Sequence, residues 1–105
     1  ELAMRIYISH PFSCLAQNKA ELERITTELT LKYPKHIFYS PISTFGFMYN
    51  TLSYDRGMEL CLDLLNLCDQ LWVFGDWSNS KGCKIEIAEA DRIDMRVIYN
   101  YEVGA

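Results

Sequence analysis

The sequence predicts a single α/β domain built on a parallel sheet, and three observations support this. The chain has 105 residues, which fits one domain with a modest core. Short β-branched and aromatic runs alternate with amphipathic helical patterns in the order βαβαβαβ. The connections are short, and right-handed crossovers between such units put helices on both faces of a parallel sheet. We therefore expect a flavodoxin-like or Rossmann-like three-layer sandwich with four parallel strands in the order 2-1-3-4.

The first half of the chain supplies two strands and one long helix. A β-branched and aromatic run over 4–8 is the first strand, and Pro11 ends it because proline cannot donate to a ladder. Ser13 is a suitable N-cap for an amphipathic helix over about 14–31. The run 36–39 is then the second strand.

A long segment over 42–50 follows the second strand and is unusually apolar and aromatic for a loop. Such a segment either folds back onto the core or lines a ligand pocket or a subunit interface. Its place after the carboxyl end of a strand favours a pocket or an interface.

The second half contains two helices and two strands. Ser53 or Asp55 caps a helix over about 54–66, which is apolar on two faces. A small domain can bury one face, and another chain is expected to cover the second. We therefore expect a homo-oligomer, a dimer or a dimer of dimers, formed through this helix and the 42–50 segment. The remaining elements are a strand over 70–74, a helix over 83–93, a strand over 95–99 and a tail over 100–105.

Composition excludes several classes of protein and of site. The net charge is −4 and there is no run of Lys or Arg, which argues against a nucleic-acid partner. The four cysteines form no Cys-x-x-Cys pair, so neither a zinc site nor any other metal or cofactor is predicted. Cys61 and Cys68 fall in a helical pattern and are interpreted as core residues of a reduced, cytoplasmic protein. No apolar run reaches about 18 residues, so no membrane span is predicted. Residues 1–3 are interpreted as an expression remnant before Met4, leaving one domain over 4–105.

The stretch over 75–86 joins a strand, a Ser- and Gly-containing turn and a helix start. Free backbone N–H groups and the positive end of a helix dipole suit a phosphate there. Trp77 and Glu86 lie within the same stretch. The alternative is an ordinary solvated loop in which Ser80 is the N-cap.

Ligands in open parallel sheets bind beyond the carboxyl ends of the strands, where the strand order reverses. The loops over 9–13, 43–49 and 76–82 should meet at that point. Aromatic rings available to stack on a base or ribose are those of Phe12, Phe45, Tyr49 and Trp77. Groups that could hold phosphate or hydroxyl oxygens are Ser9, Ser78, Ser80 and the backbone of Gly82. Further candidate ligand-binding residues are His10, Pro11, Asp76, Cys83, Glu86 and Asn100, with His10 either a base or a loop hydrogen-bonder.

Three segments carry a family resemblance: 6–12 with its Ser-His-Pro-Phe loop, 68–74 with its Cys-Asp pair, and 80–90 with Ser-x-Gly-x-x-x-Glu-x-x-x-Ala. They resemble the nucleoside 2-deoxyribosyltransferase-like superfamily, and its DUF4406 branch in particular. That branch is similar to the phage anti-Thoeris sponge proteins, which bind cyclic ADP-ribose-type signals without degrading them. The resemblance implies a nucleotide-type ligand and a phage anti-defence role in the cytoplasm of a bacterial host.

The enzymes of this superfamily use a Glu nucleophile at the signature position, and Glu86 matches it. They also carry an Asp on the second helix, and the best match here is Cys61, with Asp63 displaced onto another face. The signature Asp before Gly is Ser80 here. These departures favour sequestration of the ligand over turnover. The alternatives are a nucleoside 2-deoxyribosyltransferase or nucleotide N-glycosidase with Glu86 as nucleophile, and a small oligomeric adaptor whose apolar segment binds protein.

Overall fold

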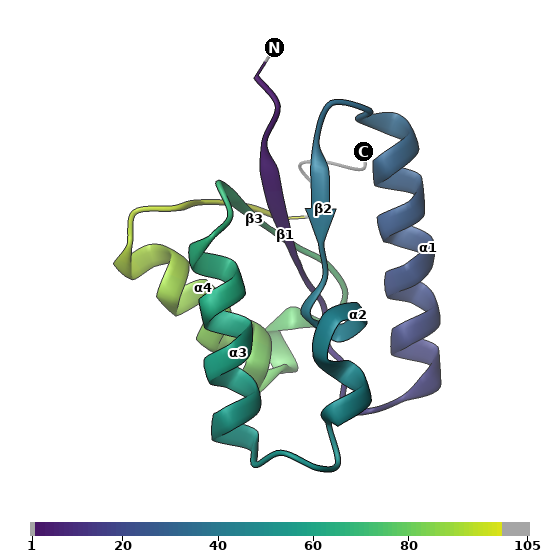
Figure 1. The fold of residues 1–105 in the computed structure, drawn as a ribbon, viewed down its shortest axis with the longest axis vertical. Coiled ribbons are helices and arrows are strands. Elements are labelled where there is room, and N and C mark those ends of the chain that lie inside the picture. The colour runs from purple at the N-terminus through teal and green to yellow at the C-terminus, as the bar shows by residue number, and fades with distance from the viewer. Residues whose placement is uncertain (1, 100–105) are drawn as a thin grey trace.

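A computed structural model describes residues 2–99, and it contains a four-stranded, all-parallel sheet in the order β2-β1-β3-β4 (Figure 1). This confirms the predicted fold class and strand order. The elements in chain order are β1 (Arg5–Ser9), α1 (Ala16–Lys32), β2 (Ile37–Tyr39), α2 (Pro41–Phe45), the 3₁₀ helix η1 (Gly46–Met48), α3 (Tyr54–Asn66), β3 (Gln70–Val73), the 3₁₀ helix η2 (Trp77–Asn79), α4 (Lys81–Arg92) and β4 (Arg96–Tyr99).

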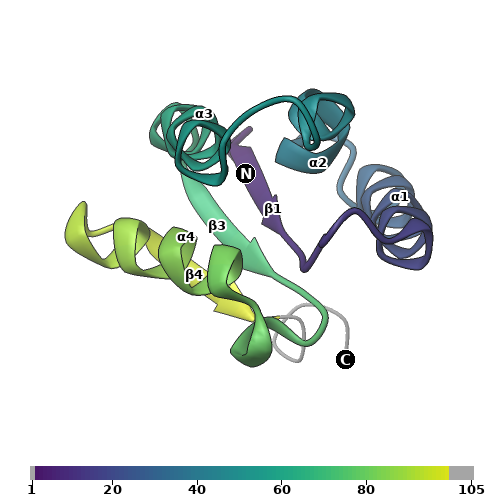
Figure 2. The same cartoon turned by 90° about the horizontal axis from the view of Figure 1, so that it is seen from below.

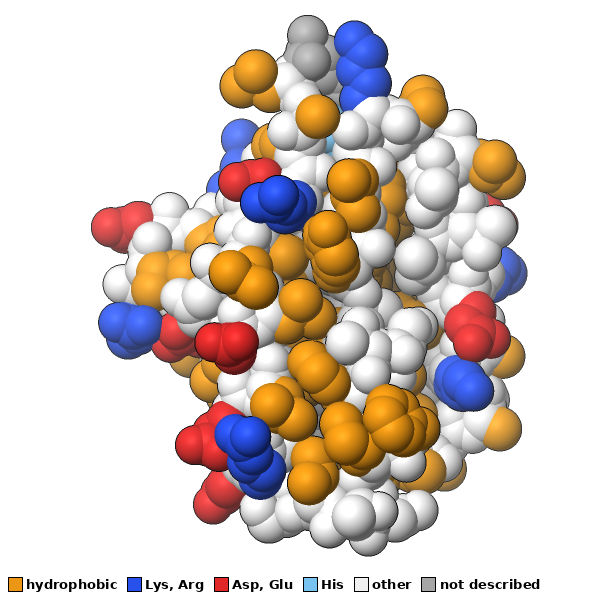
Figure 3. Space-filling view, in the orientation of Figure 1, with side chains coloured by type: hydrophobic (Ala, Val, Ile, Leu, Met, Phe, Trp, Pro, Cys, Tyr) orange, Lys and Arg blue, Asp and Glu red, His pale blue; other side chains and the backbone are white. Residues whose placement is uncertain are grey.

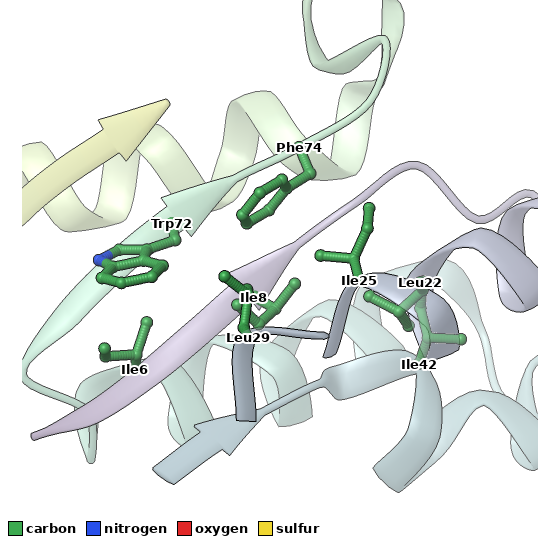
Figure 4. Packing of buried hydrophobic residues seen from close by; sticks show 8 residues of the cluster. All are labelled: Ile6, Ile8, Leu22, Ile25, Leu29, Ile42, Trp72 and Phe74. Atoms are coloured by element: carbon green, nitrogen blue, oxygen red, sulfur yellow. The ribbon is translucent and has the colours of Figure 1, made fainter. Parts of the chain in front are cut away.

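Two apolar clusters hold the helices on opposite faces of the sheet. Because side chains alternate along a strand, Ile6 and Ile8 of β1 face one side and Tyr7 faces the other. The first side packs against Leu22, Ile25 and Leu29 of α1, as Figure 4 shows. The second side packs against Leu65 of α3 and Ala90 of α4. Seen from below, α1 therefore lies across the sheet from α3 and α4 (Figure 2).

Several predicted boundaries are wrong, each for a local reason. The first helix begins at Ala16 rather than Cys14, because Ser13 and Cys14 have positive φ angles of 48° and 55° and cannot be helical. Leu15 is its N-cap and makes no side-chain cap bond, so Ser13 does not cap it. The last helix begins earlier, at Lys81, because the hydroxyl of Ser80 accepts from the backbone N–H of Cys83.

The segment over 42–50 is more regular than a loop. Ser40 caps α2 by accepting from the N–H of Ser43, and Pro41 occupies the first helical position, where its missing N–H costs nothing. η1 continues the turn, and a second serine, Ser53, caps α3. Between the two caps this segment forms a short helical wall beside the sheet.

The second apolar face of α3 is only partly covered. Leu62 and Leu64 pack against the core, whereas Leu67 is 65% exposed. Phe47 of η1 is 84% exposed. Figure 3 shows hydrophobic side chains gathered over α2 and α3 on this face of the molecule. Among residues 2–99, no helix is long and apolar enough to cross a membrane.

Candidate functional site

A cavity of about 530 Å³ opens at the carboxyl end of β1. Its walls come from the loop after β1, from α2 and η1, from α3 and from the first turns of α4. This is where the strand order reverses, since β2 and β3 flank β1 on its two sides. Its size is that of a site for a small molecule.

Glu86 of α4 contributes a buried carboxyl group to this cavity. The residue is 5% exposed, and both of its oxygens accept hydrogen bonds from β1. Tyr7 Oη donates to Oε2, and Ser9 Oγ donates to Oε1 over 2.6 Å. Tyr7 and Ser9 can both reach it because residues i and i+2 of a strand point to the same face.

Burial raises the pKa of Glu86 to about 7, while the hydrogen bonds from Ser9 and Tyr7 act in the opposite direction. Near neutral pH the group therefore exists in both protonation states. Burial, and then the charge of Glu86, raise the pKa of Tyr7 well above its usual value, so its hydroxyl remains a donor. The same two causes raise the pKa of Cys61 to about 11, so the Cys61 sulfur remains a thiol.

Aromatic rings form one wall of the cavity. Phe12 and Tyr49 meet edge to face, with ring centroids 5.2 Å apart. Phe12 also packs close to Gly46, where an added Cβ would lie 3.4 Å from Cζ of Phe12. Phe45 lines the same wall. Planar ligands suit such a wall, since aromatic faces and edges stabilise stacked rings.

Another part of the wall contains the start of α4 and a cation. Lys81 Nζ lies 4.9 Å from the ring centroid of Tyr54, and both residues line the cavity. A Cβ on Gly82 would lie 3.4 Å from the Tyr54 hydroxyl oxygen. Within the described lining, Lys81 is the only Lys or Arg, and Glu86 is the only carboxylate. The cavity therefore offers a cation near the positive end of a helix dipole and an acid one to two turns further along the helix.

The structure brings together eight of the residues predicted from the sequence to bind ligand. Those lining the cavity are His10, Pro11, Phe12, Phe45, Tyr49, Ser80, Gly82 and Glu86. Two more lie just behind the lining: Ser9, which binds Glu86, and Cys83, which is 2% exposed and hydrogen-bonded to Ser80 through its backbone.

Three predicted residues do not line the cavity, because η2 turns the β3–α4 loop toward β4. Trp77 packs on Tyr99, with ring centroids 5.0 Å apart, and it belongs to the apolar cluster on that side. Asp76 accepts from the side-chain amide of Asn79, and Ser78 is exposed. Asn100 lies outside the described residues.

His10 contributes to the lining, but its ring is directed toward α1. Its Nε2 lies 3.3 Å from Oε2 of Glu21, and its Nδ1 lies 2.7 Å from the carbonyl oxygen of Pro11. Two roles were predicted for His10 from the sequence, a base or a residue that forms hydrogen bonds within its loop. This arrangement matches the second role better.

Tyr7, Tyr54, Met58 and Lys81 are not among the predicted site residues. Cys61 is interpreted above both as a core residue and as the best match to the superfamily's second-helix Asp, and in the structure it is half-buried and lines the cavity. Tyr54, Met58 and Cys61 have the spacing i, i+4, i+7, which places them on one stripe of a helix. Tyr7 could have been found from Ser9, because the two share a strand face. Both signals were present in the sequence, but neither indicates by itself that its face borders a cavity.

A smaller hollow of about 340 Å³ lies on the β4 side of α4. Trp77, Lys84, Ile87, Asp91 and Tyr99 are among the residues that line it. It contains no buried acid and lies away from the carboxyl end of β1, so the larger cavity is the better candidate site. Among residues 2–99, no group of three His, Cys, Asp or Glu side chains could hold a metal ion, and all four cysteines are free thiols.

A comparison with known protein families finds a match over residues 4–99. The family model described as a domain of unknown function, DUF4406, matches residues 4–99. The chain belongs to the DUF4406 family. No curated protein matches it. The family description assigns no activity, so the chemistry of the cavity is the guide to the function of this DUF4406 protein.

Proposed function

We propose that this DUF4406 protein binds a nucleotide-type small molecule in the cavity beside Glu86 and holds it without cleaving it. The observation that carries the proposal is a cavity with an aromatic wall, one cation and one carboxylate, in which no second carboxylate lines the described surface. Following the family resemblance, the ligand would be a cyclic ADP-ribose-type or cyclic-nucleotide immune signal, and the protein would act as a phage anti-defence sponge.

The shape and chemistry of the cavity suit such a ligand at three points. Phe12 and Tyr49 provide aromatic surface for a base or ribose face. Lys81 and the N-terminus of α4 provide positive potential for a phosphate. Glu86 provides hydrogen bonding for a ribose hydroxyl in either protonation state.

Among the described residues that line the cavity, no second carboxylate accompanies Glu86, and this favours binding over turnover. Cleavage of a glycosidic bond by a carboxylate nucleophile also requires a group that gives a proton to the leaving base or takes one from water. The nearest candidate on α3 is Cys61, whose thiol, with a pKa of about 11, keeps its proton at neutral pH. The ring of His10 is engaged by Glu21 and Pro11.

A second candidate function has one specific observation in its favour. Tyr7 and Ser9 orient the carboxyl of Glu86 and favour its charged form, as a nucleophile requires. With a pKa of about 7, a large fraction of Glu86 is ionised at neutral pH. A nucleoside 2-deoxyribosyltransferase or nucleotide N-glycosidase is therefore the alternative.

One experiment separates these functions. The protein is incubated with adenosine, AMP, ADP-ribose and cyclic ADP-ribose, its thermal shift is measured, and it is then denatured so that the small molecules can be quantified. The sponge proposal expects a thermal shift with a phosphorylated ligand, through mass action, and full recovery of that ligand intact. Free base released by wild type but not by Glu86→Ala overturns it in favour of the enzyme. A flat panel favours the protein-binding adaptor.

The predicted homo-oligomer stays a proposal, supported by the exposed apolar side chains of Phe47 and Leu67. Size-exclusion chromatography with light scattering measures the mass of the particle. We expect a dimer or a dimer of dimers for wild type, and a shift toward monomer for the double variant Phe47→Ser and Leu67→Ser. A wild-type monomer at all concentrations contradicts this.

A further inference from the structure

The end of β1 is held between two carboxylates, one from each helical layer. Ser9 and His10 are consecutive, so their side chains point to opposite faces of the sheet. Ser9 Oγ donates to Glu86 of α4 over 2.6 Å. On the other face, His10 Nε2 lies 3.3 Å from Oε2 of Glu21 in α1. Glu86 belongs to the cavity already described, but Glu21 has no assigned role.

The ring of His10 is enclosed on several sides. Its side chain is 1% exposed, and its Nδ1 lies 2.7 Å from the carbonyl oxygen of Pro11. Gly75, with φ 73°, packs directly on it: a Cβ there would lie 3.0 Å from His10 Nε2 and 2.9 Å from Cδ of Pro11. Nε2 and the Glu21 carboxylate lie close together without the alignment of a hydrogen bond, because Nε2 has no partner of hydrogen-bond geometry, so Glu21 acts on the ring through its negative charge. The ring thus joins the loop after β1 to α1.

That loop is strained and has to be held by its surroundings. Ser13 and Cys14 both have left-handed φ angles, a conformation that costs non-glycine residues of the order of 1–3 kcal/mol each. The carbonyl oxygen of Phe12 accepts from the Leu15 N–H and from Asn18 Nδ2, each over 2.9 Å. Asn18 and Glu21 are three residues apart on α1, so they lie on the same side of that helix. One side of α1 therefore holds Phe12 and His10 at once.

We propose that Glu21 and His10 form a positioning pair that keeps the loop over 10–14 in the shape that places Phe12 in the cavity wall. The effect on ligand binding rests on the function proposed above, but the effect on the loop does not. Phe12 reaches its place against Gly46 and Tyr49 only while this loop keeps its strained turn. Glu21 acts through His10 and does not line the cavity.

Glu21 is the residue that tests this pair without unfolding the protein. Its side chain is 47% exposed, so truncation leaves no buried void, whereas changing the buried His10 would. Glu21→Ala removes the partner of His10, and Glu21→Gln keeps an acceptor oxygen at the same place. Glu23→Ala is the matched control, since Glu23 is an exposed acid on the same helix. If Glu21 contributed only to stability, Glu21→Ala would lower the free energy of unfolding but leave the affinity for ligand unchanged.

The experiment measures two quantities for wild type and the three variants. One is the dissociation constant for ADP-ribose, and the other is the set of backbone amide NMR signals of Phe12, Ser13 and Gly46 without ligand. We expect Glu21→Ala to shift these signals and to weaken ADP-ribose binding by about fivefold, the scale of one partly exposed ion pair. Glu21→Gln, which keeps an oxygen at this place but removes the negative charge, should bind no better than Glu21→Ala, and Glu23→Ala should match wild type.

The possible outcomes distinguish a failure of the positioning pair from a failure of the proposed function. If Glu21→Ala and Glu23→Ala give the same signals and the same affinity, the positioning pair is overturned while ligand binding stands. If wild type does not bind ADP-ribose but Glu21→Ala still shifts the signals of Phe12 and Gly46, the pair is supported and the proposed ligand is rejected. Weaker binding with unchanged signals overturns the route through Phe12.

Discussion

Glu86 and Glu89 lie one turn apart on α4, yet their carboxyl groups have opposite properties. Glu86 is buried beside Tyr7 and Ser9, and its burial raises its pKa to about 7. Glu89 is partly buried, with 15% of its side chain exposed, and accepts from Arg92 and from Asn66 of α3 over 2.8–2.9 Å. These hydrogen bonds, Arg92 first, lower its pKa to about 2.

The difference shows what each side of α4 does. Glu89 has a cationic partner and water, so its charge stabilises the contact between α4 and α3. Glu86 has neutral hydroxyl donors and little water, so its charge is costly to the fold. A costly group that lines a cavity and is held by two donors is typical of a functional site. Four variants test this contrast, in order of expected effect.

The largest effect is expected from Glu86→Gln above neutral pH. Because the folded pKa of Glu86 is raised from 4.5 to about 7, the folded state binds its proton more tightly than the unfolded state. Wild-type stability should therefore fall as the pH rises from about 4.5 to about 7 and then level off, a loss of about 3 kcal/mol from this group. Glu86→Gln should lack this loss and be more stable by about 3 kcal/mol at pH 8.5, as urea unfolding across pH can measure. Equal stability of the two proteins at pH 8.5 would show that Glu86 is not desolvated.

A smaller effect is expected from Tyr7→Phe, which removes the donor to Oε2 of Glu86 while keeping the buried ring. Loss of a hydrogen bond to a charged group should cost about 1–3 kcal/mol at pH 8.5 and less at pH 5, where Glu86 is protonated. The fall in stability with pH should also move to higher pH, because the Tyr7 bond lowers the pKa of Glu86. Unfolding of the double variant with Glu86→Gln provides the control. If Tyr7→Phe costs the same with and without Glu86, the two groups are not coupled.

Gly82→Ala, on the cavity side of α4, should affect stability and ligand binding in opposite directions. Alanine in a helix is more stable than glycine by up to about 1 kcal/mol. Its Cβ, however, would lie 3.4 Å from the Tyr54 hydroxyl and 3.8 Å from Sδ of Met58, inside the cavity. We expect an unchanged or higher unfolding midpoint together with weaker ADP-ribose binding. Gly57→Ala on α3, where a Cβ would contact no protein atom within 4 Å, controls for the propensity gain in the unfolding measurement only, because Gly57 also lines the cavity. Unaltered ADP-ribose affinity in Gly82→Ala would place the ligand away from Tyr54.

The smallest effect is expected from Glu89→Gln. The lowered pKa means that the stabilising effect of Glu89 is present above about pH 4.5 and is lost as the pH falls toward about 2. Exposed ion pairs contribute little, so the midpoint of thermal unfolding at pH 7 should drop only slightly, and ADP-ribose affinity should stay at the wild-type value. A large loss of affinity in this variant would remove the contrast between the two sides of α4.

Much of the fold and part of the site could be predicted because their signals are local. The alternation of apolar runs and helical patterns predicted the sheet order, and the cap at Ser80 followed from a serine before a helical pattern. The grouping of Phe12, Phe45, Tyr49 and Glu86 followed from the rule that loops meet at the carboxyl ends of parallel strands. The same rule placed Trp77 with them, and it failed there because η2 turns that ring onto Tyr99 of β4.

The sequence by itself determined the order of the elements, the family, and a glutamate in the first half of the last helix. The tertiary structure alone decided what kind of acid that glutamate is. Its donors lie 79 and 77 residues away in the chain, and its pKa depends on how completely three elements exclude water from it. Burial and hydrogen-bond partners are properties of packing between distant segments. Two glutamates three residues apart therefore become a carboxyl that titrates near neutral pH and a partly exposed carboxyl that Arg92 keeps charged.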